Sequence, residues 1–181
     1  MIQAQTTTVV QIEKLTKRYR KKTAVDELSL RVPQGSVFGL LGENGAGKTT
    51  TIQALLGLIG PDSGSIEVLG LDPVRQGLDV RRLTGYVPEA PVLYDWMTVA
   101  EIGWFAAGFH PDTEGTTSSY QTRFTELLNG FELPARQKIA TLSKGMRAKV
   151  GLTLALASDP PLLVLDEPTS GLDVLVRRDF L

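Results

Sequence analysis

Residues 42–49, which read GENGAGKT, restrict the possible folds of this chain more than any other segment. They match the phosphate-binding loop pattern GxxxxGK(S/T) at every fixed position. Glycines let such a loop turn with positive φ and bring backbone N–H groups against phosphate oxygens. Lys48 would place a positive charge near the β- and γ-phosphates, and the Thr49 hydroxyl would ligate Mg²⁺. The run therefore predicts a nucleoside triphosphate site of the P-loop type.

The segments on either side of this loop match the setting that it requires. Residues 35–41 form a short apolar run that predicts a buried strand. Residues 50–58 predict a helix whose positive dipole end faces the phosphates. One face of this helix is apolar (Ile52, Leu55, Leu56 and Ile59). A glycine-rich turn in an unrelated α/β domain is the alternative, but strand, loop and helix in succession favour the P-loop interpretation.

The composition is that of an ordinary globular protein. The 181 residues suffice for one domain with a sizeable core, and 42% of them are hydrophobic and 22% charged. A net charge of −1 does not indicate a dedicated nucleic-acid binder. Without cysteine, the chain forms neither a disulfide nor a thiolate metal site. Residues 1–8 lack the pattern of a signal peptide, and no run of about 18 apolar residues predicts a membrane span.

The remaining segments alternate between strand-like and helical patterns. Strands are expected within residues 8–32 and at 66–70, 85–87 and 162–165. Helices are expected at 80–83, 99–109, 120–128 and 148–157, with a polar loop at 110–118. We interpret the mostly helical block between residues 97 and 158 as a subdomain inserted into an α/β core.

A basic stretch interrupts the first pair of strands. It contains Lys14, Lys17, Arg18, Arg20, Lys21 and Lys22. Such charges often protect the solvated edge of a hairpin from pairing with other chains. The alternative is a basic rim close to the nucleotide or to a membrane surface.

A second chemical motif follows the last predicted strand. The apolar run at 162–165 ends in the carboxylates of Asp166 and Glu167. In a P-loop protein, such an aspartate orders the Mg²⁺ shell, and an adjacent glutamate acts as a general base on the attacking water. The alternative is a solvated strand end, and the presence of Lys48 in the same chain favours the catalytic interpretation.

Four motifs together resemble the nucleotide-binding subunit of an ATP-binding cassette (ABC) transporter. Residues 142–146 (LSKGM) resemble the family signature LSGGQ, and residues 166–173 (DEPTSGLD) match its Walker B and D-loop run. Residues 85–89 (GYVPE) stand where the family has its Q-loop, and Tyr19 stands where an aromatic side chain stacks on adenine. The motifs follow the family's order and cover nearly the whole chain.

The resemblance implies an α/β fold, namely a P-loop NTPase (ABC cassette) core with an N-terminal antiparallel β subdomain and an inserted helical subdomain. Residues 1–96 and 160–181 would form the core with the β subdomain, and residues 97–159 the helical subdomain, all within one domain. Residues 173–181 look like a helix without a stop signal. The resemblance therefore also implies a cassette that lacks its C-terminal part.

The same resemblance assigns roles to individual residues. Tyr19 would stack on the base, Glu167 would position water, and Asp173 would link two sites. Thr49, Glu89 and Asp166 would surround Mg²⁺, and Ser143 and Gly145 would contact ATP held by a second cassette, with Ser143 also a plain N-cap. The phosphates would be held by Gly42, Glu43, Asn44, Gly45, Ala46, Gly47, Lys48, Thr49 and Thr50.

The chain also departs from the family pattern. Lys144 and Met146 replace family residues of the signature, and Glu89 replaces the Q-loop glutamine. The family's switch histidine is expected beyond Leu181, and the single histidine, His110, is interpreted as a surface residue.

These residues lead to one principal functional hypothesis. The chain is expected to be an ATPase subunit that energises a membrane transporter, an exporter, with ATP and Mg²⁺ as cofactors. Its expected partners are a second cassette and a transmembrane subunit that Tyr94 or Trp96 would face, and no nucleic acid. It would lie in the cytoplasm at the inner face of the membrane. The alternatives are a soluble ABC ATPase acting on ribosomes or DNA, and an ATP-binding remnant that does not hydrolyse.

Overall fold

The computed structural model describes residues 7–110 and 119–167. The chain divides into two compact units, residues 1–83 and 84–181, and each is described here by itself. Residues 111–118 of the polar loop expected at 110–118 lie outside the described residues. So do the D-loop with Asp173 and the helix expected at 173–181.

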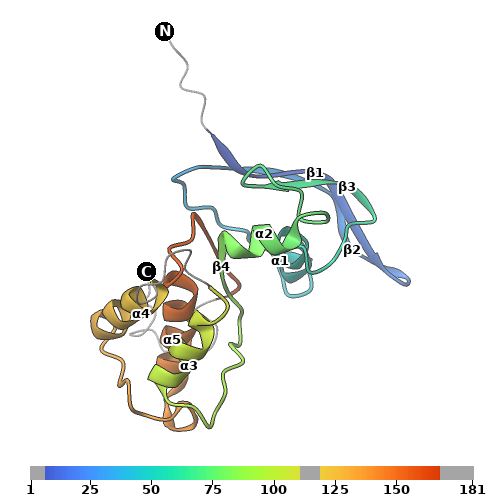
Figure 1. Cartoon of the computed structure of the whole chain (residues 1–181). Helices are drawn as coiled ribbons and strands as arrows, with labels where there is room; N and C mark the ends of the chain where they lie inside the picture. The colour runs from blue at the N-terminus through green and yellow to red at the C-terminus, as the bar shows by residue number, and fades with distance from the viewer. Residues whose placement is uncertain (1–6, 111–118, 168–181) are drawn as a thin grey trace. The chain divides into compact units, whose positions relative to one another are not determined.

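The first unit is built on a three-stranded antiparallel sheet (Figure 1). Strands β1 (Thr8–Tyr19) and β2 (Lys22–Pro33) form the expected hairpin, and β3 (Ser63–Val68) pairs with the other edge of β1. Val10 pairs with Val68, and Ile12 pairs with Ile66, and all four side chains are buried. Because alternate residues of a strand point to opposite faces, these pairs give the sheet one apolar face.

Helix α1 (Lys48–Leu55) packs against β2 and β3, and α2 (Gly77–Arg82) follows β3 in the chain. Ile52 and Leu56 of the predicted apolar face are buried. Helix α1 ends in a Schellman motif: Gly57 has a φ of 64°, and Leu58 N donates to Gln53 O at 2.9 Å. The Arg81 guanidinium also donates to Leu56 O at 3.0 Å, so backbone and side-chain hydrogen bonds together fix this end of the helix.

The strand predicted at residues 35–41 is wrong. The structure assigns no strand there, and Val37 and Leu41 are almost fully exposed. A strand exists only where a neighbour accepts its backbone hydrogen bonds. No described strand of this unit pairs with the segment, so its apolar composition alone does not produce a strand.

The second unit contains a two-stranded parallel sheet. Strand β4 (Thr84–Val87) pairs with β5 (Leu162–Leu165) in the register Thr84↔Leu162 to Val87↔Leu165. Both strands were expected from the sequence. Strand β5 differs in burial, because every second side chain of this predicted buried strand is exposed.

The same unit contains three helices that pack on one another (Figure 1). They are α3 (Val99–Ala107), α4 (Ser119–Gly130) and α5 (Lys144–Leu156), and a short 3₁₀ helix, η1 (Ile139–Thr141), precedes α5. Helix α5 also packs against β4. Their buried side chains form one hydrophobic cluster, which includes Val99, Phe124 and Val150. The expected helices are thus present, while the proposed division of the chain at residues 97 and 159 stays a prediction.

His110 is not the plain surface residue that the sequence suggested. Its ring stacks on the buried Tyr120 ring, with centroids 4.7 Å apart. Burial lowers the pKa of the His110 imidazole below its usual value. His110, which follows α3 in the chain, therefore packs on Tyr120 of α4. None of the helices in the described parts of the chain is both long and apolar enough to cross a bilayer.

Candidate functional site

The phosphate-binding loop precedes α1 and turns through two glycines with positive φ. Gly45 has a φ of 82°, and Gly47 has a φ of 91°. Ala46 N donates to Glu43 O at 3.1 Å, which closes a tight turn within the loop. Side chains other than glycine rarely adopt such backbone angles, so the two glycines define the loop's path.

Gly47 also fits closely against strand β2. A Cβ atom at this position would overlap the carbonyl oxygen of Ala24 and press on the Val25 side chain. The backbone of the loop therefore rests directly on the backbone of the hairpin. Both the φ angle and the space require glycine here.

The N-terminus of α1 is left open by its own side chains. Gly47 is the N-cap residue and provides no side-chain hydrogen bond, and the first turn contains no acidic residue. By contrast, Thr98 caps α3 in a capping box with Glu101, and Ser143 caps α5. Since the first amides of a helix need acceptors, those of α1 can bind an external anion.

Lys48 lies over this loop. Its Nζ donates to Gly42 O at 2.8 Å and to Glu43 O at 3.3 Å. These bonds hold the ammonium group at the mouth of the loop, while the Thr49 side chain beside it is exposed. The loop thus combines helix N-terminal amides without a side-chain cap, a cation and a hydroxyl within a few residues.

Tyr19 ends strand β1 in the same unit. Its ring is 46% exposed, and the Lys17 Nζ lies 5.6 Å from the ring centroid. An exposed aromatic ring with a cation on it provides a stacking surface for a base.

The acidic residues predicted to act together follow the two parallel strands of the second unit. Asp166 N donates to Val87 O at 2.9 Å, so the β4–β5 pairing continues by one residue. Glu89 follows β4 by two residues, and Glu167 follows Asp166. Carboxyl ends of parallel strands meet at one sheet edge, so all three residues follow the strands at the same edge.

Within this group, the surroundings of the carboxylates differ. Asp166 is buried (5% exposed), whereas Glu89 and Glu167 are exposed. Burial and the nearby charge of Asp166 raise the pKa of the Tyr86 hydroxyl. Glu167 has a φ of 48°, in the left-handed region that is unfavourable for a glutamate. Such local strain is common at functional sites.

Ser143 and Gly145 open helix α5. The Ser143 Oγ accepts a hydrogen bond from Met146 N at 3.2 Å, as expected of an N-cap serine. The residue is exposed, and its hydroxyl hydrogen can still be donated to a ligand. Capping and ligand binding by Ser143 are therefore compatible.

The predicted residues thus form two groups, one in each unit. The loop, Lys48, Thr49, Thr50 and Tyr19 belong to the first unit, and Glu89, Asp166, Glu167, Ser143 and Gly145 belong to the second. That the two groups meet around one nucleotide stays a prediction. Among the described residues, no three acidic or histidine side chains form a ready-made metal cage.

Sequence reasoning missed Arg147 of α5. Its guanidinium donates to Asp95 Oδ1 at 2.6 Å and to Ile139 O at 3.1 Å, which ties the segment before α3 to the helix that Ser143 begins. These partners are distant in sequence, and no local pattern indicates that they meet.

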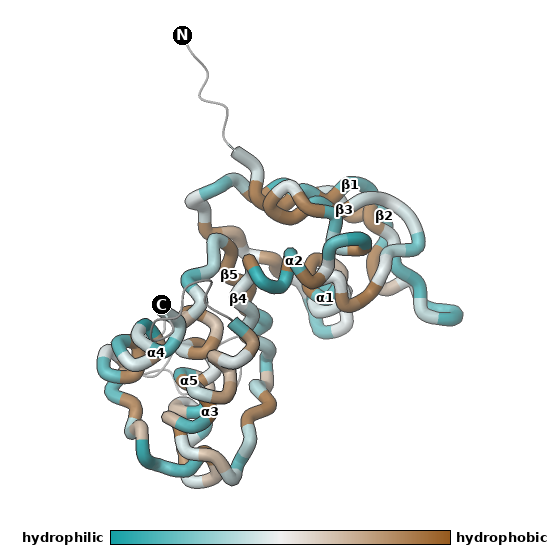
Figure 2. The backbone as a smooth tube through the Cα atoms, viewed as in Figure 1, coloured by the Kyte–Doolittle hydropathy of each residue, from teal (hydrophilic) through white to brown (hydrophobic). Residues whose placement is uncertain are grey.

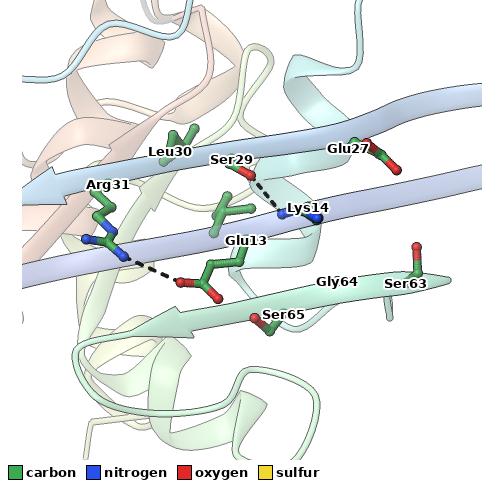
Figure 3. A pocket seen from close by; sticks show the side chains of 10 residues that line it. Glu13, Lys14, Glu27, Ser29, Leu30, Arg31, Ser63, Gly64 and Ser65 are labelled. Carbon is green, nitrogen blue, oxygen red and sulfur yellow. Dashed lines mark hydrogen bonds and ion pairs between the residues drawn. The ribbon is translucent and has the colours of Figure 1, made fainter.

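A pocket of about 740 Å³ on the first unit lies elsewhere, against β1, β2 and β3 (Figure 3). Glu13 and Arg31 form an ion pair of 3.5 Å in it, and Lys14 N donates to Ser29 Oγ at 2.9 Å. None of the residues predicted to bind nucleotide lines this pocket. We therefore place the candidate site at the loop before α1 and not in this pocket.

Known proteins share both the sequence and the fold of this chain. The sequence model described as ABC transporter matches residues 25–170. The ABC transporter ATP-binding protein YxlF of Bacillus subtilis is 41% identical over 96% of this chain and 57% of its own length. The bacitracin transport ATP-binding protein BcrA of Bacillus licheniformis is 37% identical over 96% of this chain and 55% of its own length. The chain thus spans just over half the length of these relatives.

Solved structures agree with the sequence comparison. A structure described as the ATP-binding subunit of an ABC transporter superposes with a TM-score of 0.82 and is 34% identical. That match covers 94% of this chain and 71% of the other. The ATP-binding cassette MJ1267, in its ADP conformation, superposes with a TM-score of 0.81 at 24% identity, which supports the fold alone.

Proposed function

Since this chain belongs to the ABC transporter family, we propose that it binds and hydrolyses ATP to drive a membrane transporter, and that the transporter is an exporter. The observation that carries the proposal is the glycine loop before α1, with Lys48 over it and the helix N-terminus left without a side-chain cap. This arrangement is suited to a polyphosphate.

Export is the direction that the relatives favour. Among them are SkfE of Bacillus subtilis, named for SkfA peptide export, and the ATP-binding protein I of Burkholderia pseudomallei, named for Nod factor export. We propose that this chain likewise pairs with a second cassette, head to tail, and with a transmembrane subunit. It would then lie at the inner face of the cell membrane.

The residues would divide the chemistry as follows. Tyr19 stacks on adenine, and the loop amides with Lys48 bind the phosphates. Glu167 accepts a proton from the water that attacks the γ-phosphate, because it is exposed beside the buried Asp166. Ser143 and Gly145 donate to the γ-phosphate held by the opposite cassette.

Magnesium fits the oxygen donors of these residues. It binds one or two protein oxygens and fills its remaining positions with water and substrate phosphates, so no ready-made cage is needed. Thr49 and Asp166 would be those donors, with Glu89 reaching a coordinated water. When bound, the ion neutralises charge that develops on the phosphates.

Two substitutions test the proposal on the chain itself. Lys48→Ala should weaken ATP binding at least tenfold, about the effect of one strong charge-assisted hydrogen bond. Glu167→Gln should leave ATP binding intact and abolish hydrolysis, measured as phosphate release with Mg²⁺ present. The matched control is Glu132→Gln, since Glu132 is also exposed and has a φ of 55°.

Either of two results would contradict the assignment. Turnover unchanged by Glu167→Gln would remove that residue from its role. ATP binding without turnover in the unaltered chain would support a non-hydrolysing cassette instead.

A further inference from the structure

The tip of the β1–β2 hairpin is strongly basic. Arg20, Lys21 and Lys22 follow Tyr19 directly, and this end of the hairpin is hydrophilic in Figure 2. Lys22 is the cross-strand partner of Tyr19 in the β1–β2 register. The backbone of Lys22 is therefore fixed opposite the ring expected to stack on the base.

The Lys22 side chain reaches the phosphate-binding loop. A Cβ atom built at Gly45 would lie 3.7 Å from the Lys22 Nζ. Apart from Gly45 and its two chain neighbours, no other described atom would lie within 4 Å of it. Gly45 is the middle glycine of the loop and lies two residues before Gly47, the N-cap residue of α1. Lys22 thus places its charge over the loop from the hairpin side.

The Lys22 ammonium differs from that of Lys17, which lies on the same hairpin and is bound by other groups. Lys17 Nζ donates to Gly60 O at 2.7 Å and lies 3.5 Å from the Asp62 carboxylate. Within the described ranges, no hydrogen bond or ion pair engages the Lys22 ammonium. Among the described residues, the Lys22 ammonium therefore lacks a counter-ion, and an anion held on the loop would supply one.

We propose that Lys22 is a nucleotide-binding residue that contacts the polyphosphate together with Lys48. The inference rests on the proposed function and adds to it a residue outside the phosphate-binding motif. It also decides, for this one residue, between the two interpretations of the basic stretch: Lys22 belongs to a nucleotide rim, not to a merely solvated edge.

The test measures ATP affinity by isothermal titration calorimetry on the full chain. Lys22→Gln should weaken ATP binding about tenfold, since it removes one charge-assisted hydrogen bond from a partly exposed site. Lys22→Arg, which keeps the charge, should restore most of the affinity. Lys21→Gln is the matched control, because it removes the same charge from the adjacent exposed position and should change the affinity less than twofold.

A second readout separates charge from hairpin structure. The ATP affinity of Lys22→Gln should depend less steeply on salt than that of the unaltered chain, because one ionic contact is gone. Equal losses in Lys22→Gln and Lys22→Arg with an unchanged salt dependence would overturn the inference. The inference would also be overturned if Lys48→Ala lowered the ATP affinity and Lys22→Gln left it unchanged. That result would not affect the proposed function. A chain that binds no ATP would refute the proposed function and the inference with it.

Discussion

Gly47 shows how one residue connects the loop to the rest of its unit. Its positive φ allows the turn into α1, and its missing side chain lets the loop touch the Ala24 carbonyl of β2. Gly70 also has a positive φ, of 79°, but nothing would surround a Cβ atom there. A substitution at Gly70 would therefore cause backbone strain alone, whereas one at Gly47 would cause both strain and a steric clash.

Alanine at Gly70 and alanine at Gly47 should therefore destabilise the chain to different extents. Gly70→Ala should destabilise the chain by about 1–2 kcal/mol, the usual effect of a side chain in the left-handed region. Gly47→Ala should lower the free energy of unfolding by about 1–3 kcal/mol more than Gly70→Ala does, because the hairpin backbone must also move. Urea denaturation followed by circular dichroism measures both. Equal losses in the two variants would show that the contact with Ala24 has no energetic weight.

The sequence predicts the loop better than it predicts the surroundings of the loop. The glycines and Lys48 lie in one short motif whose residue types are dictated by local chemistry. The strand expected at residues 35–41 is absent, because a strand depends on a neighbour that a local pattern does not specify. Arg147 and His110 were missed or misjudged for the same reason, since their contacts join residues distant in sequence or depend on packing.

Among the helices, packing rather than propensity decides the role of Gly103 in α3. Glycine inside a helix is ordinarily less favourable than alanine by about 1 kcal/mol. Here a Cβ atom at Gly103 would overlap the ring of Phe124, which α4 buries in the shared cluster. The usual preference should therefore be reversed at this position.

A side chain added at Gly103 should destabilise the hydrophobic cluster of the helices. Gly103→Ala should lower the free energy of unfolding by about 1–3 kcal/mol, as overpacking of a core does. Gly130→Ala in α4 is the control, since nothing lies near a Cβ atom there. In a double variant with Phe124→Leu, the added methyl group should do less harm than it does alone. If the loss of stability in the double variant equalled the sum of the losses in the two single variants, the direct contact would be ruled out.

The second unit carries an aromatic surface beside α3, formed by Tyr94, Trp96, Phe105 and Phe109. The Tyr94 ring contacts Trp96 at a centroid distance of 6.0 Å and Phe105 at 5.5 Å. Phe105 contacts Phe109 at 5.3 Å, and Trp96 is 67% exposed. Exposed aromatic groups of this kind are typical of the centres of protein interfaces. Asp95, which lies between Tyr94 and Trp96 in the chain, forms an ion pair with Arg147 of α5. The surface is thus held to the helix that begins at Ser143, so a partner seated on it would act on the predicted signature region.

The corresponding prediction concerns assembly with the membrane subunit. Trp96→Ala should weaken that assembly by about 2 kcal/mol or more, roughly thirtyfold, as truncation of a central interface tryptophan does. Folding and ATP affinity should not change, because the side chain is mostly exposed. Co-purification with the co-expressed transmembrane subunit measures the effect. Trp104→Ala is the matched control, since Trp104 is 73% exposed on α3 and makes no ring contact with this surface. Intact assembly in Trp96→Ala, or equal losses in both variants, would show that the transmembrane subunit binds elsewhere.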